Sequence, residues 1–272
     1  MKVNSHLIKR IHMEILMPTA DESRAFFDTL VLAPKKPQIS RFSSTQEDKV
    51  DDPDLLLGKD APVGVAFADN LSDENSQAAM DSVAFAELYA EGNADLKNDP
   101  IGWHNKYALA MRNCGWYMPS YKYMEHVERR TNITMDVVVM DVIKAVAGRN
   151  APAMLSLLGS AFDTMKSDGE LVTLFDNNSK NGKSADFRIL PCLQSAKGTA
   201  ITSLLAMDCE LSTQQGGAWF WKWNVSSIKM KKAAAMVELN MRLHERNREF
   251  IHEALDMDSE AFFKGAKLPK KA

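Results

Sequence analysis

Apolar and polar side chains alternate along residues 185–230, and this alternation organises the chain. From residue 200 to residue 211 every second side chain falls on the same side of an extended segment, because successive residues of a strand point to opposite faces. Residues 185–192 and 219–225 also show strand patterns, with turns at 194–198 and 212–217. The pattern predicts an antiparallel meander whose middle strand carries a cysteine on its apolar face. That face consists of Ile201, Ser203, Leu205, Met207, Cys209 and Leu211.

Apolar residues at spacings of three and four predict helices in the rest of the chain. Asp99 followed by Pro100 is typical of a helix start, whereas Gly92 and Gly148 are typical of helix ends. Residues 135–147 are apolar nearly all round, which favours a buried helix, although their β-branched side chains also allow a strand. The predicted helices span 72–91, 99–114, 135–147, 151–167 and 231–255.

Together these elements predict a single mixed α/β domain of the α+β class, in which helices cover an antiparallel sheet. Before residue 70 repeated prolines forbid long regular elements. The helix at 231–255 has an apolar stripe and opposite charges at spacings of three and four, so it should lie across the sheet. Residues 266–272 form a lysine-rich tail that is expected to be disordered. The expected order is irregular structure over 1–70, mainly helices over 71–180, strands over 185–230 and helices over 231–264.

The composition is that of an ordinary globular protein and narrows the function only slightly. The chain has 272 residues, 45% hydrophobic and 25% charged, with a net charge of -3, so a general affinity for nucleic acid is not expected. Its cysteines at 114, 192 and 209 are odd in number and lack metal-site spacing, which favours a reducing compartment. The first residues lack the unbroken apolar region of a secretory signal, so we expect a protein made in the cytoplasm. No apolar stretch reaches the roughly 18 residues of a spanning helix.

Candidate chemistry outside the meander is sparse. Cys114 lies in sequence near His104 and His126, so a histidine-activated thiol enzyme is one hypothesis, but no orienting carboxylate can be identified. A buried structural thiol is the simpler interpretation. The common nucleotide-binding and serine-hydrolase loops are missing from the sequence. His244 and His252 lack the spacing of a helical metal pair and are predicted to lie on a helix surface.

Tryptophans alternate with polar residues near a group of lysines after the middle strand. Such a group can bind single-stranded nucleic acid or lie at a membrane interface, but a sheet face packed on helices, with lysines at its rim, is the favoured interpretation. The net charge argues against nucleic acid. The residues concerned are Trp219, Trp221, Trp223, Lys222, Lys229, Lys231 and Lys232.

The position of Cys209 allows two interpretations. A thiol facing the core from a central strand is usually a small hydrophobic side chain. The alternative is that Cys209 carries an acyl chain as a thioester, because the apolar strand face around it could line a slot. Each buried methylene contributes about 0.8 kcal/mol, so a sixteen-carbon chain would contribute roughly 10 kcal/mol at most. Such a slot would also keep water from the ester.

The C-terminal third of the chain resembles the family of the Erwinia virulence factor, Evf. The resemblance runs from FDNNS at Phe175 through PCLQSAKG, LLAMDCELS and WFWKWNVSSIKM to NREFIHEAL. It implies a mixed α/β fold and a palmitoyl chain buried inside the protein on the cysteine matching Cys209, while Cys114 and Cys192 receive no role. It further implies a bacterial protein that promotes infection or persistence in an insect host, with membrane association and no enzymatic activity.

A fully sequestered acyl chain does not anchor a protein, because anchoring requires the chain to enter the bilayer. Either the chain is released by an opening of the helices over the sheet, or it completes the core as a filler. Two further hypotheses remain open. One is a thiol-dependent enzyme that uses Cys114 or Cys209, and the other is a module that holds a noncovalent lipid in the apolar slot.

Overall fold

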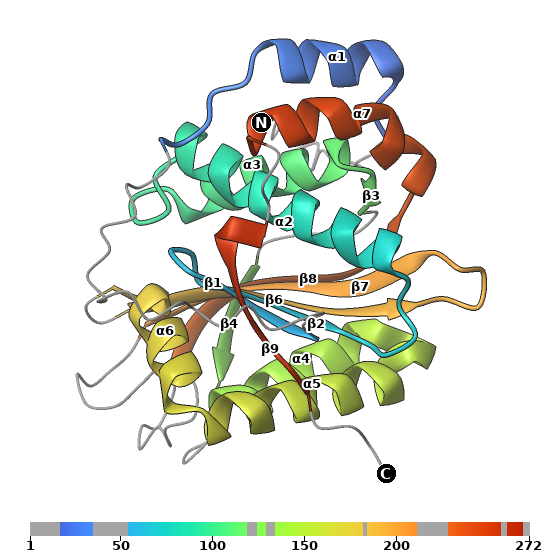
Figure 1. Cartoon of the computed structure of the whole chain (residues 1–272). Helices are drawn as coiled ribbons and strands as arrows, with labels where there is room; N and C mark the ends of the chain where they lie inside the picture. The colour runs from blue at the N-terminus through green and yellow to red at the C-terminus, as the bar shows by residue number, and fades with distance from the viewer. Residues whose placement is uncertain are drawn as a thin grey trace, which may run out of the picture.

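A mixed β-sheet lies between two layers of helices (Figure 1). The structure is a computed structural model that describes residues 17–34, 54–118, 124–128, 134–181, 184–210, 228–256 and 260–268. The predicted mixed α and β class is confirmed. The helices are α1 (Ala20–Asp28), α2 (Asp73–Asn93), α3 (Pro100–Asn113), α4 (Met135–Ala147), α5 (Ala151–Ser167), α6 (Gly169–Ser179) and α7 (Met241–Ala254), with short 3-10 turns at Gly148–Asn150 and Glu260–Phe262.

The sheet joins strands from both halves of the chain. Its order is β3-β8-β7-β6-β2-β1-β9, with β4 also paired to β8 and β5 to β6. Strands β6, β7 and β8 form an antiparallel meander, and β2 adds to β6 in parallel. The strands are β1 (Leu55–Gly58), β2 (Val63–Phe67), β3 (Trp116–Tyr117), β4 (Met124–Glu128), β5 (Lys180–Asn181), β6 (Ser184–Gln194), β7 (Ala200–Glu210), β8 (Ile228–Leu239) and β9 (Phe263–Ala266).

Side chains at the helix starts explain where several helices begin. Asp99 accepts a hydrogen bond from the Gly102 backbone N–H at 2.9 Å, so α3 starts at Pro100 as its sequence predicts. Thr19 and Glu22 form a reciprocal capping box at α1. The predicted helices at 72–91, 135–147 and 151–167 are confirmed within one or two residues as α2, α4 and α5.

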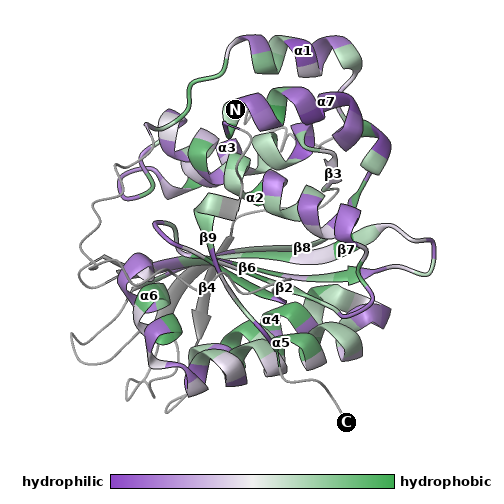
Figure 2. Ribbon diagram, viewed as in Figure 1, coloured by the Kyte–Doolittle hydropathy of each residue, from purple (hydrophilic) through white to green (hydrophobic). Residues whose placement is uncertain are grey.

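The two helical layers differ in composition. α1, α2, α3 and α7 lie on one side of the sheet, with α1 farthest from the strands, and α4, α5 and α6 lie on the other (Figure 1). Figure 2 shows that α1 and α7 carry many hydrophilic residues, whereas α4 and α5 are mostly hydrophobic. Each layer buries its own apolar cluster against the sheet. We call these the α2–α3 side and the α4–α5 side.

The prediction of one helix over 231–255 is wrong in its first half. Residues 228–239 form β8, and only Met241–Ala254 form the helix α7. The alanine-rich sequence fits either structure, but β8 pairs with β7 along its length and thereby satisfies the backbone hydrogen bonds of the meander. Its apolar residues alternate, with Ala233, Ala235, Val237 and Leu239 buried on one face.

Two further predictions also need correction. The region 1–70 is not irregular throughout, because α1, β1 and β2 lie in it, and β2 is a central strand. These strands were not predicted because Pro53 and Pro62 stand close before two short apolar runs, and proline disfavours regular structure. Residues 231–264 are not all helical, and the predicted tail begins inside β9, which ends at Ala266. The strand predicted at 219–225 lies outside the described residues.

Candidate functional site

The middle strand of the meander places Cys209 inside the protein. Cys209 is the second-last residue of β7, where it pairs with Ala185 of β6 and Met230 of β8. The prediction that its strand face is apolar is confirmed, because Ile201, Leu205, Met207 and Cys209 all belong to the core of the α4–α5 side. The Cys209 side chain has 0% exposure.

Long flexible side chains surround this face of the sheet. Met207 lies opposite Phe187, and Leu205 lies opposite Ile189, in the β6–β7 ladder. The hydroxyl of Ser203, the polar member of the face, lies 3.0 and 2.9 Å from the sulfur atoms of Met154 and Met236 and can donate its one hydrogen to either. Methionine is unbranched and fills irregular space, so a core with many methionines can repack around a guest molecule. Those packed on this side are Met135, Met140, Met154, Met165, Met207 and Met236.

Burial controls the chemistry of the Cys209 thiol. It raises the pKa of Cys209 well above the ordinary range, and the nearby carboxylates of Asp208 and Asp186 raise it further. The thiol is therefore protonated at neutral pH in the folded protein. Because the thiolate is the nucleophilic form, this environment does not activate Cys209 for attack on a substrate.

The other two cysteines are also buried and protonated. Burial raises the pKa of Cys192 to about 12, and it raises the pKa of Cys114 beyond the ordinary range. All three cysteines are free thiols. The histidine beside Cys114 is His244, and its Nδ1 atom contacts the Cys114 carbonyl oxygen at 2.9 Å instead of the thiol. His104, one of the two histidines proposed from the sequence, lies against Trp103 and near Arg188, and the His126 side chain lies outside the described residues.

A carboxylate that sequence inspection did not find lies close to Cys114. Asp81 of α2 is buried, and its Oδ2 atom lies 2.8 Å from Nε2 of His252. The predicted surface position is wrong for His244, which is 2% exposed, while His252 is half-buried in its contact with Asp81. These contacts join α7 to α2 and α3. In the described ranges no group of three or more His, Cys, Asp and Glu side chains is arranged to hold a metal ion.

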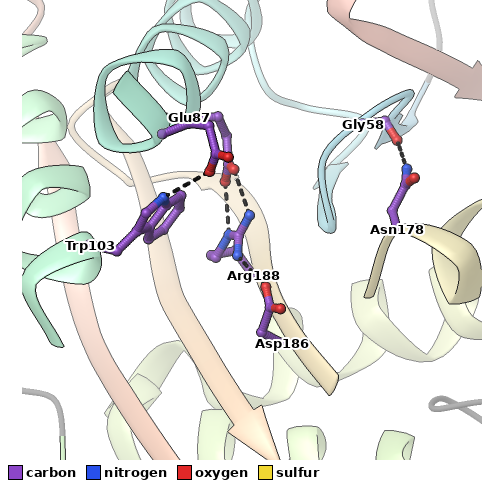
Figure 3. A network of polar contacts seen from close by, with 7 residues as sticks. Gly58, Glu87, Trp103, Asn178, Asp186 and Arg188 are labelled. Carbon is purple, nitrogen blue, oxygen red and sulfur yellow. Dashed lines mark hydrogen bonds and ion pairs between the residues drawn. The ribbon is translucent and has the colours of Figure 1, made fainter. Parts of the chain in front are cut away.

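The opposite face of the same strands holds a buried charged cluster (Figure 3). Arg188 of β6 donates from Nε and Nη2 to the two carboxylate oxygens of Glu87 on α2, at 2.8 and 2.5 Å. Its Nη1 atom donates to Asp186 at 3.0 Å. The guanidinium carbon also lies 4.5 Å from the centre of the Trp103 ring on α3. Arg188 thus contacts both helices and its own strand, and we call this group the Arg188 cluster.

Burial and charge shift the ionisation of the Arg188 cluster. Desolvation raises the pKa of Glu87 despite the attraction of Arg188. Desolvation also raises the pKa of Asp186 to about 6, with nearby Asp208 adding to the effect. Burial lowers the pKa of His104 to about 3, and the positive charge of Arg188 contributes. The neighbouring carboxylates outweigh desolvation at Arg188 and raise its pKa, so it stays charged.

Sequence reasoning missed the Arg188 cluster, although a signal was present. Asp186 and Arg188 alternate with Phe187 and Ile189 along β6, so two charges occupy the same face of a strand in the middle of the sheet. Charged residues are almost never fully buried unless paired. A partner had to exist on a covering helix, but only the fold identifies it as Glu87.

The molecule is therefore a mixed α/β protein with a buried thiol on one face of its sheet and a buried ion pair on the other. No protein-family model matches the chain, and a comparison with curated proteins gives no match. Among solved structures, the Evf virulence factor is similar with 11% identity and a TM-score of 0.38, over 89% of this chain and 91% of that one.

Two further solved structures show similarity of the same order. A delta-endotoxin matches 76% of this chain and 88% of its own at 13% identity and a TM-score of 0.34. The activated Cyt2Ba monomer from Bacillus thuringiensis subsp. israelensis matches 64% of this chain and 96% of its own at 16% identity and a TM-score of 0.36. At these TM-scores the matches do not establish a common fold.

Most of the tryptophans and lysines that could bind a membrane or nucleic acid lie outside the described residues. Trp219, Trp221, Trp223 and Lys222 are outside the described residues, as are the side chains of Lys229 and Lys231. Among the described residues, no helix has both the length and the apolar composition needed to cross a bilayer.

Proposed function

We propose that this chain is a bacterial virulence factor that carries a palmitoyl group as a thioester on Cys209. The observation that carries the proposal is the position of that thiol, fully buried on the apolar face of the central strand. The role in infection or persistence in an insect host, and the membrane association, rest on the resemblance of the C-terminal third to the Evf family.

The α4–α5 side suits an acyl chain on chemical grounds. Its core consists of aliphatic residues, phenylalanines and methionines, so hydrocarbon would replace hydrocarbon contacts there. Burial of sixteen carbons would contribute roughly 10 kcal/mol at most, which is comparable with the total stability of a domain. A thioester in this layer would also be shielded from water.

A thiol-dependent enzyme fits the geometry less well. The catalytic form of cysteine is the thiolate, but burial raises the pKa of both Cys114 and Cys209. The histidine near Cys114 contacts a carbonyl oxygen, so it is not placed to take the thiol proton. Acylation of Cys209 itself requires contact with a donor, so it would precede closure of the α4–α5 layer or occur in an opened form.

Intact mass spectrometry tests the proposal directly. Protein purified from bacteria should carry an added mass of about 238 Da that hydroxylamine removes, as expected for a palmitoyl thioester. Cys209→Ser should lose this mass, whereas Cys192→Ser, a substitution at an equally buried thiol on the other side of the sheet, should keep it. An unmodified wild-type mass, or a label that persists in Cys209→Ser, would overturn the assignment.

Liposome binding and thermal melting then distinguish the two possible roles of the acyl chain. If the acyl group is released to a bilayer, acylated protein should bind liposomes and Cys209→Ser should not. If the acyl group is a filler, both should fail to bind, and the unacylated protein should melt at a lower temperature. Each kcal/mol corresponds to about 2–4 °C for a domain of this size. Equal melting of the two forms would exclude the filler role.

A further inference from the structure

The Arg188 cluster joins three elements at the boundary between the sheet and the α2–α3 layer. Arg188 belongs to β6, Glu87 to α2 and Trp103 to α3. The arginine side chain is 1% exposed and the Glu87 side chain 5% exposed. Separating the α2–α3 layer from the sheet would therefore break a two-point ion pair and expose Arg188, Glu87 and Trp103 together.

Several carboxylates lie near the single guanidinium group of Arg188. Asp186 lies directly opposite Asp208 in the antiparallel β6–β7 pair, so the two carboxylates are on the same face of the sheet. Glu91 of α2 accepts a hydrogen bond from Trp103 Nε1 at 3.3 Å. The charge on Asp186 is thus opposed by Asp208, Glu87 and Glu91 and favoured by Arg188. Asp208 also lies opposite Lys231 of β8 in the β7–β8 pair.

A histidine lies near the same guanidinium. His104 of α3 is 1% exposed and lies edge-on to Trp103, with 5.1 Å between ring centres. A proton on His104 would place a second positive charge near Arg188 inside the core. Tyr107, one turn further along α3, stacks on Trp103 and also faces Arg188.

We propose that Arg188 is the centre of a pH-sensitive latch that holds the α2–α3 layer on the sheet, in which Asp186 and His104 respond to acid in opposite directions. Protonating Asp186 removes a carboxylate from an acid-rich cluster and tightens the closed state. His104 binds its proton readily only when the layer opens, so acid favours the open state through this residue. The latch is independent of any acyl group on Cys209, which lies on the other face.

The expected size of each effect follows from proton linkage. The pKa of His104 lies at about 3 when closed and at 6.5 ordinarily, so lowering the pH from 7.5 to 5.0 favours opening about thirtyfold. The pKa of Asp186 lies at about 6 when closed and at 3.8 ordinarily, so the same change favours closing about tenfold. The two effects oppose each other, and Glu87, whose pKa is also raised by burial, adds to the closing effect of acid.

Amide hydrogen exchange of α2 and α3, corrected for intrinsic exchange rates, tests the latch in the whole chain. Relative to the wild-type change in protection between pH 7.5 and 5.0, the change should shift about tenfold toward opening in Asp186→Asn and about thirtyfold toward closing in His104→Gln. The ratio is taken within each variant, so an overall loss of stability does not affect it. His104→Phe replaces His104→Gln if the latter does not fold.

The matched control is Asp163→Asn, which removes an exposed carboxylate from α5 on the other side of the sheet. It should follow the wild type. If Asp186→Asn and His104→Gln respond to pH as the wild type does, or if their signs are reversed, the latch is wrong. A response from only one of the two residues also contradicts the paired mechanism.

Discussion

The two faces of the β6–β7 pair differ in how they hold their helices. Facing the α2–α3 side, β6 presents Asp186 and Arg188, which form a fixed ionic cluster with Glu87. One residue along, Phe187 and Ile189 face the α4–α5 side and meet an apolar layer with many methionines. Ionic and hydrogen-bonded contacts require one geometry, whereas apolar packing tolerates rearrangement. One sheet thus has a geometrically specified face and an adaptable face.

Breaking the ion pair should give the largest effect. Arg188→Met leaves Glu87 buried without its charge partner, so the free energy of unfolding should fall by about 3–5 kcal/mol. Urea unfolding at pH 7 measures it. The double variant Glu87→Met with Arg188→Met should recover part of this loss, because it removes both charges. A double variant less stable than Arg188→Met would show that the pair is not the source.

Two adjacent leucines compare the faces with matched chemistry. Leu204 and Leu205 are both fully buried in β7, but Leu204 packs on the α2–α3 side and Leu205 on the α4–α5 side. Substitution by alanine should cost about 2–5 kcal/mol at each position in unacylated protein. In protein that carries an acyl group on Cys209, the cost of Leu205→Ala should be smaller, because hydrocarbon can fill the cavity. An equal reduction for Leu204→Ala would contradict the assignment of the two faces.

The pH dependence of the free energy of unfolding tests the raised pKa of Asp186. Its pKa is raised from 3.8 to about 6 in the folded protein, so the stability that it contributes at low pH is lost as the pH rises through about 6. Asp186→Asn removes this dependence. The free energy of unfolding of the variant, minus that of the wild type, should therefore increase by up to about 3 kcal/mol between pH 4 and pH 7.5. A difference that stays constant with pH would exclude the shifted carboxyl.

A surface ion pair on the α4–α5 layer should have the smallest effect. Lys166 of α5 lies 2.6 Å from Asp136 of α4, with 41% of the lysine side chain exposed. Lys166→Met should change the free energy of unfolding by about 0–1 kcal/mol, because solvent screens exposed pairs. Urea unfolding in low and high salt measures it. A loss comparable with that of Arg188→Met would remove the distinction between the interior and exterior charges.

Local sequence signals predicted most helices and the faces of the meander. Asp99 and Pro100 set the start of α3, and the alternation through Cys209 gave the correct side of β7. The signal failed at residues 228–239, where alanines favour a helix but the ladder with β7 imposes a strand. Pairing between distant segments decides such cases, and local propensity contains no information about it.

The Arg188 cluster shows that local sequence signals have the same limit in predicting the candidate site. Alternation identified β6 and β7, but the partner of Arg188 is a glutamate on a helix distant in sequence. Likewise, Asp81 and His252 are neighbours only because α2 packs against α7. The position of Cys209 was predictable because it depends on one strand alone. Contacts made by two or more elements required the fold.

The arrangement of the sheet also constrains how the chain can be made. β2 completes its parallel pairing only with β6, and β1 is bordered on its outer edge by β9 near the C-terminal end of the described chain. A nascent polypeptide can therefore pair β1 with β2 early, but the second partners of these strands, β9 and β6, are synthesised much later. Long-range pairing of this kind slows folding and leaves strand edges exposed to aggregation. We expect newly made chains to depend on chaperones during translation.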